Sequence, residues 1–194
     1  IPSVATPNGQ AAFLFLLTLL GSPLAALATN VGSQGSAGNL ANPAVNGVWY
    51  IPTSRWDVAR RDLTTTYSNG VDAAISSSYG PTDLAVGLFS PATCGAAYEL
   101  CVYDADYGDN GYNGWNQCIG TVVGADPNRT CSQQRVQINQ FYSPPAQRIA
   151  CHEMAHSVGL RHTQEQASCV KRTADGGNSQ VLSSHDIGHL NARY

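Results

Sequence analysis

Eleven residues in the last quarter of the chain constrain its fold more than any other segment. Residues 152–162 read H-E-M-A-H-S-V-G-L-R-H and hold three histidines at fixed spacings. On an α-helix, positions i and i+4 lie on one face, so His152 and His156 can direct their imidazoles at one point. A longer helix would carry His162 away from that point, but Gly159 permits a turn because glycine adopts positive φ without a Cβ penalty. The segment therefore predicts a helix, a turn and three converging imidazoles.

Three imidazoles beside a carboxylate are typical of a catalytic zinc site. Such a zinc ion usually has three protein ligands and keeps its fourth position for water. Glu153 follows the first histidine, about 100° around the helix, which places its carboxylate beside the open position and not on the metal. We expect one Zn²⁺ ion, with Glu153 as the general base for a water that attacks a peptide carbonyl. The expected ligands are His152, His156 and His162.

The motif is similar to that of the metzincin zinc endopeptidases, such as matrixins and astacins. Cys169 and residues 184–191 also resemble the small secreted actinobacterial members of that group. The resemblance implies an α+β catalytic domain over residues 48–194. It would contain a twisted five-stranded mixed sheet, an active-site helix bearing the motif and a C-terminal helix. It also implies an edge strand that pairs with an extended substrate.

The chain departs from the metzincin pattern at one position. Metzincins carry a methionine in a turn below the zinc, whereas the single methionine here is Met154, inside the motif. Val170, directly after Cys169, stands at about the place of that methionine. A valine can fill the same hydrophobic base, since the residues around the ligands tune a metal site more than they create it. We therefore expect Gly159 and Val170 to support the site.

Two other functions share the same four residues. A zinc amidase acting on cell-wall peptides would differ only in its cleft. A non-catalytic secreted binding module would keep zinc for stability, and the missing methionine favours it. Glu153 argues against the module, because a structural zinc ion needs no general base.

Length and charge limit the range of partners. The 194 residues suffice for one domain with a substantial core, and a net charge of −3 is too mild to indicate a nucleic-acid partner. We expect a monomer that acts on a protein or peptide substrate and binds no nucleic acid.

The first part of the chain has the pattern of an export signal. An uncharged apolar run, residues 11–20, precedes Ala26-Leu27-Ala28, which has the small-x-small form of a cleavage site. The run is shorter than the about 20 residues that span a bilayer, so we expect removal of residues 1–28 and no stable membrane anchor afterwards. Residues 29–47, rich in Gly, Ser, Asn and Ala, predict a flexible linker or the remnant of a pro-segment. The mature protein is expected to be secreted and extracellular.

Six cysteines fit an exported chain stabilised by disulfides. Six cysteines allow many connectivities, among which the simplest local scheme pairs Cys94 with Cys101, Cys118 with Cys131, and Cys151 with Cys169. The last bridge would tie the ligand helix to the segment after the third histidine. Cysteine ligation of a second zinc ion is disfavoured, because the sequence has no C-x-x-C pair.

Hydrophobic patterning predicts the remaining elements. A helix is expected at least over residues 71–78, before Gly80-Pro81, and Ser143-Pro144-Pro145 introduces the ligand helix. Strands are expected at residues 48–51, 84–89, 98–103, 115–123 and 135–141.

Two further clusters of possible metal ligands have simpler interpretations. The loop Asp104–Gly111 gathers carboxylates that could hold Ca²⁺, but their spacing does not match a calcium-loop pattern, which favours a solvated turn. His185 and His189 are spaced i, i+4 without an evident third ligand. We favour a closing helix there, begun by a capping box of Ser183 and Asp186.

Overall fold

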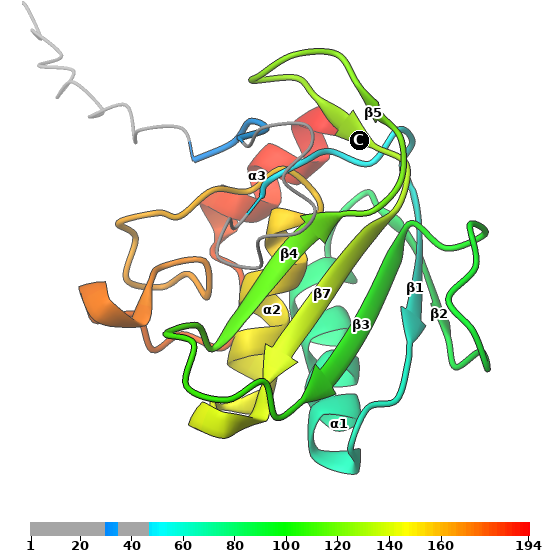
Figure 1. Cartoon of the computed structure of the whole chain (residues 1–194). Helices are drawn as coiled ribbons and strands as arrows, with labels where there is room; N and C mark the ends of the chain where they lie inside the picture. Colours follow the sequence, from blue (N-terminus) through cyan, green and yellow to red (C-terminus); the bar gives the residue numbers. More distant parts are fainter. Residues whose placement is uncertain (1–29, 35–46) are drawn as a thin grey trace, which may run out of the picture.

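The fold is an α+β arrangement in which helices cover one five-stranded mixed sheet (Figure 1). The computed structural model describes residues 30–34 and 47–194. The predicted signal segment, residues 1–28, lies outside the described residues, as does most of the predicted linker. The strands are β1 (Arg55–Arg60), β2 (Ala85–Phe89), β3 (Leu100–Ala105), β4 (Gly114–Cys118), β5 (Val122–Val123), β6 (Thr130–Cys131) and β7 (Gln134–Asn139). The helices are α1 (Thr65–Ala74), continued by a π-helical segment (Ile75–Tyr79), α2 (Ala146–His156) and α3 (Ser184–Arg193).

The main sheet has the strand order β2-β1-β3-β7-β4. β4 is antiparallel to β7, and the other neighbouring pairs are parallel. The helix α1 connects the parallel strands β1 and β2, as a crossover of this kind requires. α1 and α2 pack side by side and α2 also contacts β4 and β7, which places the motif helix against the antiparallel edge of the sheet (Figure 1).

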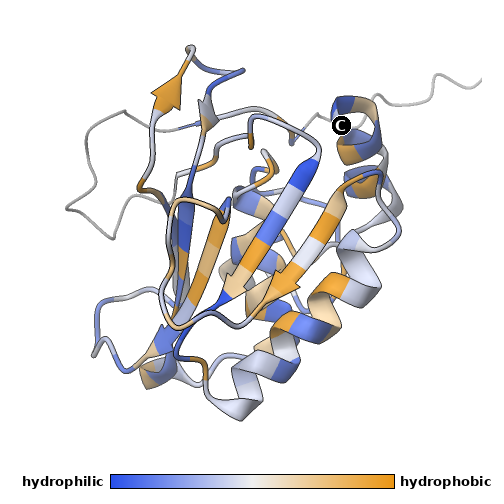
Figure 2. Ribbon diagram, turned by 90° about the vertical axis from the view of Figure 1, so that its right-hand side faces the viewer, coloured by the Kyte–Doolittle hydropathy of each residue, from blue (hydrophilic) through white to orange (hydrophobic). Residues whose placement is uncertain are grey.

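Alternation along the strands builds the core between the sheet and these helices. In β7, Val136 and Ile138 are fully buried, whereas Arg135 and Gln137 are partly exposed. Figure 2 shows the resulting bands of apolar and polar residues along the strands. Fully buried residues of β1, β3, α1 and α2 complete this core: Trp56, Val58, Leu100, Val102, Val71, Ala74, Ala150 and Met154.

Four of the five predicted strands are confirmed as β2, β3, β4 and β7, and the remaining strand of the main sheet is one that was not predicted. Residues 48–51 were expected to form a strand, but they make only isolated bridges, because Trp49 N–H donates to the His156 carbonyl and Tyr50 N–H to the Arg129 carbonyl. The fifth strand is β1. Three of its six residues are charged, so its sequence did not indicate a strand. One of them, Arg60, forms an ion pair with Asp72.

Two predicted boundaries also differ. The strand expected over residues 115–123 ends at Cys118, where Ile119 and Gly120 N–H both bind the Gln133 carbonyl, and the chain resumes as β5 in a separate two-stranded sheet with β6. The predicted helix over residues 71–78 is confirmed, and it begins earlier, at Thr65.

The three local disulfides predicted from the sequence are confirmed. They join Cys94 to Cys101, Cys118 to Cys131, and Cys151 to Cys169. The second bridge packs with Trp49 in a small separate cluster, whereas the third lies in the main core.

Residues 30–34 of the predicted linker lie against the domain. Asn30 is buried, and Val31 forms a bridge with Leu160, which lies inside the histidine motif. The Asn30 side-chain amide donates to the Arg161 carbonyl and to the Asp186 carboxylate. Residues 30–34 therefore hold the turn that leads to the third histidine.

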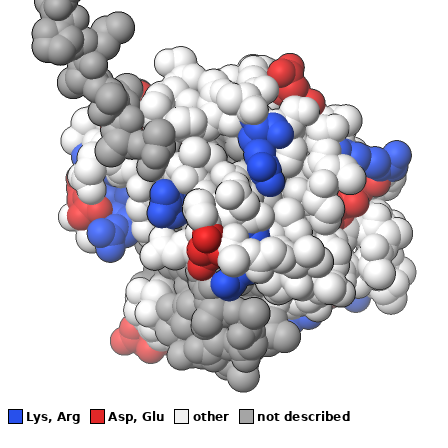
Figure 3. Space-filling view, turned by 90° about the horizontal axis from the view of Figure 1, so that it is seen from above, with Lys and Arg blue, Asp and Glu red and all other residues white. Residues whose placement is uncertain are grey.

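Charged residues are interspersed on the surface. On the face shown in Figure 3, the described basic and acidic residues alternate and leave no continuous basic patch. Within residues 30–34 and 47–194, no helix combines the length and the apolar character needed to cross a bilayer.

Candidate metal centre

The three motif histidines converge as their spacing predicts. His152 and His156 lie one turn apart on α2, and the helix ends at His156. Gly159 then adopts a φ of +91°, and Leu160 N–H returns to the Ala155 carbonyl. This turn brings His162 back, so that one ligand atom from each histidine lies within 4.8 Å of the others.

The ring contacts fit ligands that surround one ion. The Nε2 atoms of His152 and His162 are 3.2 Å apart. The three pairs of ring centroids are separated by 5.0, 5.1 and 4.9 Å. Among the described residues, no other group of three His, Cys, Asp or Glu side chains converges in this way.

Backbone carbonyls fix the tautomers of two of the rings. His152 Nδ1 lies 2.7 Å from the Cys169 carbonyl, and His156 Nδ1 lies 2.7 Å from the Leu160 carbonyl. A carbonyl oxygen only accepts hydrogen bonds, so each Nδ1 carries the proton and each neutral ring keeps its Nε2 lone pair free. Histidine ligands of metals are oriented in the same way by carbonyls or carboxylates.

Burial keeps the imidazoles neutral. It lowers the pKa of His156 to about 4. Burial, followed by the neighbouring His156, lowers the pKa of His162 to about 3. The pKa of His152 is well below its usual range because of burial and then the two other histidines. Neutral imidazole is the form that binds a metal ion.

Glu153 is buried beside the ligands. Burial raises the pKa of its carboxyl to about 8, against the opposing effect of Arg148. Its Oε2 atom and the Nε2 atom of His156 are both buried without a hydrogen-bond partner. Buried polar atoms are rarely left unpaired, and a cation with a coordinated water would satisfy both. The donor set therefore fits a metal ion.

A glycine on the edge strand makes room for this carboxylate. A Cβ atom at Gly114, the first residue of β4, would lie 2.9 Å from Cγ of Glu153 and 3.0 Å from the Gln137 carbonyl oxygen. No pattern in the sequence pointed to Gly114, because its role depends on a contact between residues 39 positions apart.

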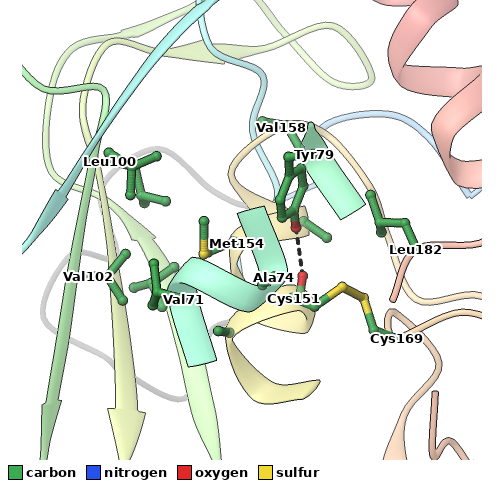
Figure 4. Packing of buried hydrophobic residues seen from close by; sticks show 14 of the residues in the cluster. Val71, Ala74, Tyr79, Leu100, Val102, Cys151, Met154, Val158, Cys169 and Leu182 are labelled. Carbon is green, nitrogen blue, oxygen red and sulfur yellow. Dashed lines mark hydrogen bonds between the residues drawn. A yellow bond between two sulfur atoms is a disulfide. The ribbon is translucent and has the colours of Figure 1, made fainter. Parts of the chain in front are cut away.

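The disulfide between Cys151 and Cys169 joins the ligand helix to the carbonyl that orients His152. Figure 4 shows this bridge beside Tyr79, whose hydroxyl donates to the Cys151 carbonyl over 2.7 Å. Val170 follows Cys169 and is fully buried in the main core. The sequence pointed to both cysteines but not to the Cys169 carbonyl, because every residue has a backbone carbonyl and its partner cannot be identified from the residue type.

A cavity of about 340 Å³ lies at the start of the ligand helix. Arg148, one turn before His152, is one of its lining residues, together with Tyr142 and Pro144. The guanidinium donates to Thr173 Oγ1 and to the Lys171 carbonyl, and its Nε atom has no partner.

The carboxylate loop is held together by an amide and not by converging carboxylates. Asn139 Nδ2 donates to the Gly108 and Tyr112 carbonyls, and its Oδ1 accepts from Tyr107 N–H. Asp106 accepts from Gly108 N–H, and Asp109 accepts from the Tyr142 hydroxyl. These contacts favour the solvated turn over a calcium site.

Comparison with known protein families finds no family that matches this chain, and comparison with curated proteins finds no match either. The function is therefore inferred from the site.

Gly159→Ala is expected to lower the free energy of unfolding by at least about 2 kcal/mol, because it adds a clash to an unfavourable φ. The new Cβ would lie 2.2 Å from the Tyr50 ring. Gly176 is the matched control, since it has a φ of +80° and open space around its Cβ, so its replacement should cost only about 1 kcal/mol. Urea denaturation measures both values. Equal losses would show that the Tyr50 contact does not constrain this turn.

The zinc affinity of the Glu153→Gln protein is expected to fall less than about tenfold between pH 7 and pH 5. Three imidazoles with pKa values near 6.5 would lose about 10⁴-fold over this range, because protons would compete for each nitrogen. Here the pKa values of His156 and His162 are about 4 and 3, so protons compete only below that range. Glutamine removes the carboxyl that titrates near pH 8. Competition with a coloured chelator measures the zinc affinity. A peptide of residues 152–162 is the reference, because its imidazoles are in water and its zinc affinity should fall steeply between pH 7 and pH 5.

Proposed function

We propose that this protein is a secreted zinc-dependent endopeptidase of the metzincin type. The observation that carries the proposal is the combination of three preorganised imidazoles with the unpaired carboxylate of Glu153 at the edge of the sheet. A structural zinc ion would need no such carboxylate. The sheet and helices described above are compatible with a zincin-like catalytic domain.

The four residues have separate roles in the proposed reaction. His152, His156 and His162 would bind the ion. Bound zinc supplies a Lewis acid and lowers the pKa of a coordinated water toward about 7. Glu153 would accept a proton from the attacking water while the water oxygen adds to the peptide carbonyl carbon. Glu153 would then deliver that proton to the amide nitrogen as the C–N bond breaks, which would release a carboxylic acid and an amine.

An extended peptide is the substrate that the edge strand favours. Within the described residues, β4 forms a ladder with β7 alone, although the Asn116 carbonyl accepts a hydrogen bond from Gly47 N–H and the Asn116 side-chain amide donates to the Gly47 carbonyl. Free backbone N–H and C=O groups at such an edge can pair with a peptide. Gly114 lies at the end of β4 nearest Glu153, so a peptide along this edge would pass the reacting groups.

Secretion is supported by the three disulfides, which persist in oxidising surroundings. We propose that the protein acts outside the cell, as a monomer, on proteins or peptides and not on nucleic acid.

Hydrolysis of unfolded casein tests the proposed function. Cleavage is expected with the zinc-loaded protein, should stop when a chelator removes the metal, and should return when zinc is restored. A parallel assay with cell-wall peptides tests the amidase. Cleavage of those peptides alone would replace the endopeptidase by the amidase, and stoichiometric zinc without cleavage of either substrate would favour the binding module.

A further inference from the structure

The C-terminal helix carries a second pair of converging imidazoles. His185 and His189 are spaced i, i+4 on α3 and are both partly buried. Their Nε2 atoms lie 3.1 Å apart, and their ring centroids are separated by 4.3 Å at an interplanar angle of 70°. Within the candidate zinc site, the Nε2 atoms of His152 and His162 are separated by nearly the same distance, 3.2 Å.

We propose that His185 and His189 form a second metal site, which binds one divalent transition-metal ion through both Nε2 atoms, with water completing the coordination. Two nitrogen ligands at about 2.0–2.1 Å from a tetrahedral ion lie about 3.3 Å apart, so the pair is already close to the geometry of a chelate. Imidazole favours Zn²⁺, Ni²⁺ and Cu²⁺ over Ca²⁺ and Mg²⁺, which take oxygen ligands. The site therefore differs in chemistry from the carboxylate loop.

The surroundings of the pair suit a cation. Asp186, between the two histidines in sequence, accepts hydrogen bonds from Asn30 and from the Ser183 backbone and hydroxyl, and its negative charge lies close enough to act on His189. Burial, and then the neighbouring His185, lower the pKa of His189, which favours the neutral ring that binds metals. The nearby Arg193 lies over the Tyr50 ring, 4.1 Å from its centroid.

The site of His185 and His189 is expected to bind metal more weakly than the three-histidine centre. In the first site, carbonyls fix Nδ1 of His152 and His156, whereas within the described residues no acceptor binds Nδ1 of His185 or His189. Loss of such orienting contacts alone costs about 10- to 100-fold in metal affinity, and the second site also lacks a third protein ligand. We expect an exchangeable ion, bound at least about 100-fold more weakly than the first.

Titration with Zn²⁺ and with Ni²⁺, followed by calorimetry, tests this site. The wild-type protein is expected to bind one ion tightly and a second more weakly. His185→Ala and His189→Ala should each weaken the second event at least about tenfold, and the double variant should resemble either single variant, because a chelate needs both rings. Alanine suits these partly exposed helix positions, and circular dichroism confirms that the variants fold. A second event that survives in the single variants with less than twofold change would refute the chelate.

Two further measurements separate this site from the proposed function. A His156→Ala protein should lose the tight event and keep the weak one, so a failure of proteolysis leaves the second site testable. In nitrogen-detected NMR spectra of the imidazoles, Zn²⁺ should shift Nε2 of His185 and His189 together. A shift of only one ring, or a second ion that appears only in dimers by sedimentation, would contradict a chelate within one chain.

Discussion

Replacing Glu153 with glutamine is expected to lower kcat for peptide hydrolysis by about 10²- to 10⁴-fold, the usual contribution of a general base. The amide has nearly the shape of the carboxylate, so it fits the space that Gly114 leaves beside α2. It cannot accept and return a proton. Zinc should still bind in one tight equivalent, because the three imidazoles are unchanged.

Timed assays with a peptide substrate measure kcat, and mass-spectrometric metal analysis measures the number of bound zinc ions. Glu99→Gln is the matched control, since Glu99 accepts a hydrogen bond from Asp57 N–H and takes no part in the histidine cluster. Its activity should stay within about twofold of wild type, as expected for a residue outside the site. If Glu153→Gln retained more than a tenth of the activity, the proton transfer would have to be assigned to another group.

Removal of the bridge between Cys151 and Cys169, with both replaced by alanine, is expected to lower both the free energy of unfolding and the zinc affinity. The bridge closes a loop of 18 residues, and a loop of that size contributes about 3 kcal/mol to the free energy of unfolding. The change should also weaken zinc binding about 10- to 100-fold, because the Cys169 carbonyl that orients His152 is no longer tied to the ligand helix.

The bridge between Cys118 and Cys131 supplies the control. It closes a loop of 13 residues, so its removal should cost a similar free energy, about 3 kcal/mol. Neither of its cysteines belongs to the histidine cluster, and zinc affinity should stay within about threefold once the folded fraction is taken into account. Chemical denaturation and chelator competition distinguish the two variants. Equal losses of zinc affinity would mean that the Cys151 bridge acts through stability alone.

The histidine cluster could be predicted from the sequence because it depends on local geometry. The i, i+4 spacing of His152 and His156 and the turn at Gly159 are properties of eleven consecutive residues. The same holds for the capping box of Ser183 and Asp186, which is present, and for disulfides that close short loops.

Features that depend on distant contacts could not be predicted. Residues 48–51 have the composition of a strand, yet their backbone binds the ends of other segments, and β1 takes the place in the sheet. Asn30 lies in a stretch with the composition of a linker, but its amide bridges Arg161 and the buried Asp186. Local composition carries no information on partners more than a hundred residues away.

For the hydrolase proposed above, the bridge at Cys151 also bears on when activity would begin. Its sulfurs remain thiols in the reducing interior of a cell, where a newly made chain would lack the covalent tie between its ligand helix and the segment that orients His152. Full metal affinity would then arise only after oxidation. A cell that makes such a hydrolase would be shielded from it until the chain reaches an oxidising compartment, through the chemistry of one pair of cysteines.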